Sequence, residues 1–140
     1  VKETLFNKLM FNLEGARVLD LFCGTGNLGL EALSRGAQHV TFVDSHKQSL
    51  MITRDNIAKL KVEKSDYSIL QKDVLTYLGA YVGDPFDIIF ADPPFTQKMA
   101  HDVMLAAAAS PAFGSTTLLT IESERKERME DSYPPLARYD

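Results

Sequence analysis

Short apolar runs alternate with amphipathic segments along this chain, and the alternation predicts its fold class. The apolar runs have the length of buried strands, whereas the segments between them repeat apolar residues every three or four positions, as helices do. We expect helices at 2–13, 27–35, 45–60 and 97–109, a short turn or helix at 74–78, and strands at 17–22, 40–43, 67–70, 86–91 and 116–122. Strands that alternate with helices in this way favour an α/β fold, with a doubly wound, mostly parallel sheet and helices on both faces.

Local signals predict where several of these elements begin and end. Gly36 is the stop signal of the helix over 27–35, because glycine adopts the backbone conformation that follows many helices. Ser45 is expected to be the N-cap of the helix that runs to about Leu60. In a doubly wound sheet, ligands bind at the carboxyl ends of the strands, so the residues at those ends are the candidates for chemistry.

Length and composition describe a single domain. The chain has 140 residues, of which 45% are hydrophobic and 24% charged, which is enough for one core and too little for two. A net charge of −4 excludes a strongly basic nucleic-acid-binding module. The single cysteine, Cys23, allows neither an internal disulfide nor a multi-cysteine zinc site.

The same survey predicts a cytoplasmic protein with no membrane segment. No apolar run approaches the ~18 residues of a membrane span, and residues 1–4 carry no signal pattern. The three histidines show no metal-ligand spacing among themselves or with the acids, so we expect no metal site.

A glycine-rich loop lies between the first predicted strand and the next helix. Residues 24–29 read G-T-G-N-L-G, and glycines such as Gly24 and Gly26 allow a tight turn that a ligand can approach closely. Asp44 lies twenty residues beyond Gly24, at the end of the next strand, where its carboxylate can accept hydrogen bonds from ribose hydroxyls. The pattern indicates a nucleotide cofactor. The alternative is a plain strand-to-helix turn, with Asp44 capping the following helix.

Asp20 helps to choose between cofactors. It lies within the strand, four residues before Gly24, and a carboxylate there repels a pyrophosphate but suits a cationic ligand. S-adenosylmethionine carries an ammonium, a sulfonium and a ribose, and no phosphate. A nicotinamide-dependent oxidoreductase that uses the glycine loop stays open as an alternative. Asp20 could instead be a structural acid that bonds to N–H groups of the loop.

A second motif, Asp92-Pro93-Pro94-Phe95, directly follows the clearest apolar strand. Prolines fix the backbone, so Asp92 and neighbouring carbonyls can project rigidly toward a ligand. Such acceptors can hold the amino group of a nucleobase and direct its lone pair at a sulfonium methyl group, while Phe95 stacks on the base. The alternative is a strand-ending proline turn with Phe95 in the core.

Together these motifs resemble a known family. The run 18–26 resembles motif I of Rossmann-like S-adenosylmethionine-dependent methyltransferases, and Asp92-Pro93-Pro94-Phe95 resembles their amino-methylating motif IV. With K-E-T-L-F-N at 2–7, G-L-E-A-L-S-R-G-A at 29–37 and F-V-D at 42–44, the chain resembles the RsmD family of bacterial enzymes. That family methylates the guanine N2 amino group in small-subunit ribosomal RNA.

The resemblance implies a Rossmann-like methyltransferase fold and a role for each matched residue. Cofactor contacts would come from Asp20, Gly24, Gly26, Asp44 and Asp73, the last near the adenine amino group, and the target-base site from Asp92, Pro93 and Phe95. The implied partner is ribosomal RNA or the small ribosomal subunit. We expect residues 1–140 to be one methyltransferase domain, monomeric, without the basic amino-terminal stretch and the carboxy-terminal hairpin strand that family members carry.

Two further functions stay open beside this one. Methylation of DNA or of a free nucleobase would use the same amino-group chemistry, and a non-catalytic binding domain could retain a cofactor fold. Cys23 is interpreted as a small packing residue rather than a nucleophile, because no histidine is placed to activate it.

Overall fold

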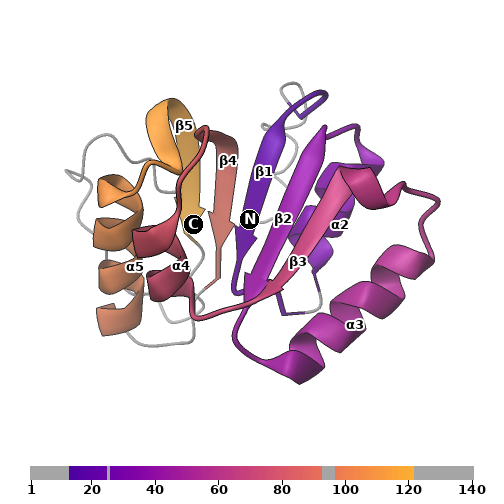
Figure 1. Cartoon of the computed structure of the whole chain (residues 1–140), viewed down its shortest axis with the longest axis horizontal. Helices are drawn as coiled ribbons and strands as arrows, with labels where there is room; N and C mark the ends of the chain where they lie inside the picture. The colour runs from indigo at the N-terminus through magenta and orange to yellow at the C-terminus, as the bar shows by residue number, and fades with distance from the viewer. Residues whose placement is uncertain (1–12, 25, 93–96, 122–140) are drawn as a thin grey trace.

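A five-stranded sheet, in which all neighbouring strands are parallel, forms the centre of the fold (Figure 1). The computed structural model describes residues 13–24, 26–92 and 97–121. The strands are β1 (Arg17–Leu21), β2 (His39–Asp44), β3 (Tyr67–Gln71), β4 (Phe86–Ala91) and β5 (Phe113–Ile121), and their order across the sheet is β3-β2-β1-β4-β5.

Helices cover both faces of the sheet, because alternate strand residues point to opposite sides. The helices are α2 (Asn27–Ser34), α3 (Lys47–Ala58), α4 (Val74–Ala80) and α5 (Gln97–Ala109), with a 3-10 turn, η2 (Lys64–Asp66), before β3. One core cluster joins Val18, Phe42 and Phe90 of the strands to α2 and α3. The other joins residues such as Leu19 and Ile89 to α4 and α5, on the opposite side (Figure 1). The predicted α/β class with a parallel sheet is confirmed.

The strand order creates a switch point beside β1. From β1 the chain moves outward to β2 and β3, and then returns to place β4 and β5 on the other side of β1. Crossovers leave β1 in opposite directions at this point, so the loops after β1 and β4 diverge and leave room for a ligand. Residues 22–24 and Asp92 follow these two strands directly.

Several element boundaries differ from the sequence-based expectation. The first strand ends at Leu21, because Phe22 has a φ of 58° and cannot continue it. Ser45 as the N-cap of α3 is wrong: His46 holds that place, in an extended conformation, and the helix begins at Lys47. The side chain of Asp44 accepts the His46 N–H at 2.9 Å. This bond holds residues 44–46 in a turn, so the helix begins one residue later than the sequence predicts.

The last strand starts earlier than expected. β5 begins at Phe113 rather than at residue 116, and its pairing with β4 is irregular between the Phe86–Phe113 and Ile88–Leu118 pairs. Gly114 and the polar residues after it break the apolar alternation, so the sequence pattern hides this part of the strand. By contrast, Gly36, with a φ of 96°, follows α2 as predicted.

The predicted helix at 2–13 lies outside the described residues except for Leu13, as does residue 122 of the predicted last strand. Within the described ranges, no helix has the length and apolar character that crossing a bilayer requires.

Candidate functional site

The predicted site residues meet at the carboxyl edge of the sheet. Asp44 is the last residue of β2, the glycine loop follows β1, and Asp92 follows β4. Because β1 pairs with both β2 and β4, these three segments are neighbours. The Asp92 N–H points to the Leu21 carbonyl oxygen, at 3.4 Å, so the segment after β4 starts beside the segment after β1.

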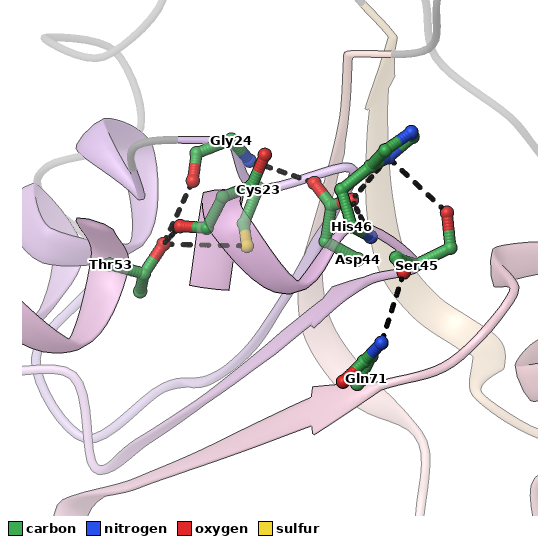
Figure 2. Close-up of polar contacts among 8 residues, drawn as sticks. Cys23, Gly24, Asp44, Ser45, His46, Thr53 and Gln71 are labelled. Atoms are coloured by element: carbon green, nitrogen blue, oxygen red, sulfur yellow. Dashed lines mark hydrogen bonds and ion pairs between the residues drawn. The ribbon is translucent and has the colours of Figure 1, made fainter. Parts of the chain in front are cut away.

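Gly24 is held on both polar groups of its backbone (Figure 2). Its N–H donates to Oδ2 of Asp44 at 3.1 Å, and its carbonyl accepts a hydrogen bond from the Thr53 hydroxyl at 2.9 Å. Asp44 comes from β2 and Thr53 from α3, so two separate elements fix the loop that follows β1.

Asp44 is also bound from its other side. Its Oδ1 accepts the His46 N–H at 2.9 Å, and the His46 Nδ1 lies 3.3 Å from the same oxygen. The residue is only 6% exposed. A carboxylate offers about four acceptor positions, so these contacts leave capacity for ribose hydroxyls. A cap of α3 was the alternative function for Asp44, but its bond is to the N–H of His46, which precedes the helix, and not to an N–H of the first turn.

Each glycine of the loop meets a different steric requirement. Gly24 has a φ of 58°, and a Cβ added there would meet no heavy atom within 4 Å, so this side of the loop faces open space. Gly26 has a φ of 83°, and a Cβ there would lie 3.0 Å from the Thr53 methyl carbon. At Gly29 a Cβ would come within 2.3 Å of the Phe42 ring. The first glycine leaves room for a ligand, and the other two permit close packing.

Asp20 is buried at the start of α2. It is 3% exposed, and its Oδ2 accepts the Gly29 N–H at 3.0 Å. Gly26, the N-cap of α2, has no side chain with which to cap the helix. The Asp20 carboxylate therefore accepts an N–H of the first helical turn that has no partner within the helix. Its negative charge also interacts favourably with the dipole of α2. This is the structural role that sequence reasoning left open, and a cofactor contact of Asp20 stays a prediction.

Asp73 follows β3 at the same edge and caps α4. Its Oδ2 accepts hydrogen bonds from the Thr76 N–H at 3.0 Å and from the Thr76 hydroxyl at 3.1 Å. The residue is exposed. Its predicted contact with an adenine amino group stays a prediction.

The three predicted substrate residues fall partly outside the described residues. Asp92 is half-buried and follows β4 directly. Pro93 and Phe95 belong to the segment 93–96, which the structure does not describe, so their predicted roles are untested.

The electrostatics of the loop favour a positive ligand. Burial, with the negative charges of Asp20 and Asp44, raises the pKa of Cys23 to about 12, so its thiol stays protonated and is no nucleophile at neutral pH. The described loop residues 22–24 and 26 include no lysine or arginine that would bind a pyrophosphate.

The described residues form no metal site, and a cavity that they line lies away from this edge of the sheet. Among residues 13–24, 26–92 and 97–121, no group of three or more His, Cys, Asp or Glu side chains is placed to hold a metal ion. A cavity lined by Ala16, Ile88, Leu118 and their neighbours lies at the opposite, amino-terminal edge of the sheet.

Sequence reasoning missed two residues of the site. Thr53 looks like any polar residue of an amphipathic helix, so only the fold shows that it reaches the loop. Gly29 was visible as the third glycine of the motif, but its contact with Phe42 depends on how α2 crosses β2. The described set, an open-sided glycine loop beside a β2 carboxylate in a negative environment, fits a cofactor with a ribose and a cationic group.

Comparisons with known proteins agree with this arrangement. A family model described as conserved hypothetical protein 95 matches residues 1–140. The ribosomal RNA small subunit methyltransferase D of Haemophilus influenzae is 34% identical over 126 residues, which cover 89% of this chain and 65% of that protein. The Escherichia coli K12 protein of the same name is 33% identical over 124 residues, with 89% and 61% covered. This chain thus spans less than two thirds of the length of these relatives.

Solved structures show the same fold. The crystal structure of a candidate methylase from Haemophilus influenzae matches with a TM-score of 0.82 at 32% identity, over 92% of this chain and 81% of that one. A conserved hypothetical protein from Streptococcus pyogenes matches with a TM-score of 0.81 at 26% identity, over 94% and 81%.

Proposed function

This chain belongs to the family described as conserved hypothetical protein 95, and from that premise we propose that it is an S-adenosylmethionine-dependent methyltransferase. Its proposed substrate is the N2 amino group of a guanine in small-subunit ribosomal RNA. Support comes from the two relatives named ribosomal RNA small subunit methyltransferase D. Action on ribosomal RNA or on the small subunit, a cytoplasmic location and a monomeric state belong to the same proposal.

One observation carries the proposal: the glycine loop and Asp92 follow two strands that are neighbours in the sheet. Asp92 follows β4, whose neighbour β1 leads into Gly24, and the Asp92 N–H points to the Leu21 carbonyl. A cofactor on the loop would therefore lie next to a substrate at Asp92. Methyl transfer requires this proximity, because it is catalysed largely by orientation.

The cofactor end of the site would be built by β1, β2 and β3. Asp44 would accept hydrogen bonds from the ribose hydroxyls, while Gly24 offers the open side of the loop. Gly26 lets the loop pass into α2, and the negative charge of Asp20 favours a cationic group nearby. We further propose that Asp73, at the end of β3, binds the adenine amino group.

The substrate end would be built by the segment after β4. Bound S-adenosylmethionine supplies a methyl group that is already activated by its sulfonium, and the electron pair of the broken bond stays on sulfur. Asp92 would accept N–H hydrogen bonds from the target amino group and direct the nitrogen lone pair at that methyl group, and the methylated nitrogen would then release one proton to solvent. Pro93 and Phe95 are proposed to shape the pocket for an extruded base, as base-modifying enzymes require.

The decisive experiment measures product and cofactor binding separately. The protein is incubated with S-adenosylmethionine and small ribosomal subunits from cells that lack the modification, and the digested RNA is analysed by mass spectrometry. We expect N2-methylguanosine from the wild type and at least a hundredfold less from D92A. Binding of S-adenosylhomocysteine to D92A should stay within about threefold of the wild type. D55A, at an exposed aspartate of α3, is the matched control.

Each other outcome has a defined meaning. Methylated DNA without methylated RNA would reject the substrate and keep the chemistry. Stabilisation by NAD but not by S-adenosylhomocysteine in a thermal shift would favour an oxidoreductase. Full activity of D92A would contradict the role of this carboxylate.

A further inference from the structure

Thr53 lies beneath the glycine loop, although it belongs to α3. Its side chain is 0% exposed, and its hydroxyl donates to the Gly24 carbonyl at 2.9 Å (Figure 2). The Gly24 N–H donates to Oδ2 of Asp44 at 3.1 Å. The backbone N–H and the carbonyl of Gly24 are thus both bound by buried side chains. One of these side chains belongs to β2 and the other to α3.

A second acceptor is available to the Thr53 hydroxyl. The Ser49 carbonyl, one helical turn earlier, lies 3.1 Å away, and bonding to that position is ordinary for a threonine in a helix. One hydroxyl proton cannot serve both acceptors fully. The bond to Gly24 is the shorter one, and it is the only one of the two that reaches another element.

The methyl group of Thr53 also fits the loop. A Cβ added at Gly26 would lie 3.0 Å from the Thr53 methyl carbon and 3.1 Å from its hydroxyl oxygen. A side chain at position 26 would therefore require Thr53 to shift by a few tenths of an ångström, and the φ of 83° at Gly26 would strain any other residue there. The hydroxyl and the methyl group of Thr53 together limit how closely the loop approaches α3.

We propose that Thr53 is a cofactor-positioning residue, whose hydroxyl holds the Gly24 carbonyl so that the open side of Gly24 faces the cofactor. Gly24 has a φ of 58°, and the space beside its Cα is empty within 4 Å. A loop held in this conformation before binding loses less conformational freedom when the cofactor arrives. The inference rests on the proposed cofactor, but it concerns a residue that would not touch that molecule.

The test replaces the hydroxyl and the methyl group separately. T53V keeps the shape of the side chain and removes the hydroxyl, whereas T53S keeps the hydroxyl and removes the methyl group. We expect T53V to bind S-adenosylhomocysteine about five- to tenfold more weakly, the usual effect of losing one buried hydrogen bond. T53S should stay within about twofold. Affinities are measured by titration calorimetry well below the melting temperature of each variant.

A control variant separates positioning from general loss of stability. Thr117 is a buried threonine in the middle of β5, and its hydroxyl donates to the carbonyl of Phe86, the first residue of β4, away from the glycine loop. T117V should lower the free energy of unfolding and leave the affinity for S-adenosylhomocysteine unchanged. If T53V does not fold, T53A replaces it, because T53A and T53S differ by the hydroxyl oxygen alone.

Amide hydrogen exchange gives a readout that needs no ligand. In the cofactor-free protein, the Gly24 amide should exchange faster in T53V than in T53S or the wild type. Equal affinity of T53V and the wild type, equal exchange at Gly24, or equal weakening by T53V and T53S would each overturn the positioning role. If the wild type binds no S-adenosylhomocysteine, the proposed function itself fails, and the exchange data alone still show whether Thr53 holds the loop.

Discussion

At the scale of single residues, Asp44 joins the architecture of the loop to its proposed chemistry. One oxygen holds the Gly24 N–H and the other holds the His46 N–H, so the carboxylate is oriented before any ligand arrives. A ribose bound to the remaining acceptor positions would meet a group that cannot rotate away. Orientation of this kind is what makes a single acid effective in binding a cofactor.

The D44N substitution tests this double role. Asparagine has the same shape but offers one acceptor oxygen, and its NH₂ group would face one of the two backbone N–H donors. Since hydrogen bonds to charged groups contribute about 1.5–3 kcal/mol, we expect S-adenosylhomocysteine to bind about 10- to 100-fold more weakly. Calorimetric titration measures this affinity, with D55N on the exposed side of α3 as control. Unchanged affinity in D44N would exclude the ribose contact.

Cys23 illustrates how the acids of the site affect a neighbour. Its pKa is raised from 9.0 to about 12 by burial, and then by Asp20 and Asp44. Between these two pH values the folded protein keeps a proton that the unfolded chain releases, so the free energy of unfolding falls as pH rises through this range. C23A should show a shallower fall above pH 9 in urea denaturation. At pH 8 a thiol reagent should label the native protein far more slowly than the urea-unfolded chain, and equal rates would contradict this assignment.

At the scale of elements, the position of the amino-terminal end of α2 depends on two glycines, Gly26 and Gly29, which have no side chain. Gly26 cannot cap the helix, so Asp20 of β1 supplies the acceptor, and Gly29 lets the helix approach Phe42 of β2. Gly26 and Gly29 thus set how closely α2 approaches its neighbours, whereas Gly24 leaves room for a ligand. The loop cannot be altered without moving the helix.

Two glycine-to-alanine substitutions distinguish close packing from helix propensity. At Gly29 a Cβ would lie 2.3 Å from the Phe42 ring, so G29A should destabilise the protein by about 1–3 kcal/mol. At Gly79 of α4 a Cβ would meet nothing within 4 Å, so G79A should stabilise it by about 0.5–1 kcal/mol. Urea denaturation of both variants gives the two values. Stabilisation by G29A would show that α2 can shift away from β2 without cost.

The elements themselves were readable from the sequence because their patterns are local. The apolar run at 17–22 and the clear run at 86–91 predicted β1 and β4, and the alternation with helices predicted that the strands pair in parallel. Contacts between elements were not readable. No local signal shows that Thr53 reaches Gly24, that Asp20 caps α2 in place of Gly26, or that the helix after β2 begins beyond Ser45. These depend on the distances at which the elements pack.

At the scale of the whole molecule, charge is distributed unevenly around the site. The chain carries a net charge of −4, yet residues 47–72 contain six Lys or Arg and three Asp or Glu. Lys47 begins α3 and Lys72 directly follows β3, so both lie at the carboxyl edge of the sheet, and both are exposed. Lys61 and Lys64 precede β3 and lie toward the opposite edge. The proposed RNA substrate would therefore meet the positive charge of Lys47 and Lys72 beside the site, despite the acidic composition.

This distribution predicts a position-dependent effect of charge reversal. If Lys47 and Lys72 contact phosphates that flank the target base, the double variant K47E/K72E should lower kcat/KM for the ribosomal substrate by roughly tenfold or more and weaken its salt dependence. The affinity for S-adenosylhomocysteine should change little. K61E/K64E makes the same change in net charge at the far edge and should have a much smaller effect. Equal losses in both double variants would mean that only the total charge matters, and no loss in either would mean that the RNA approaches from the β4–β5 side of the sheet.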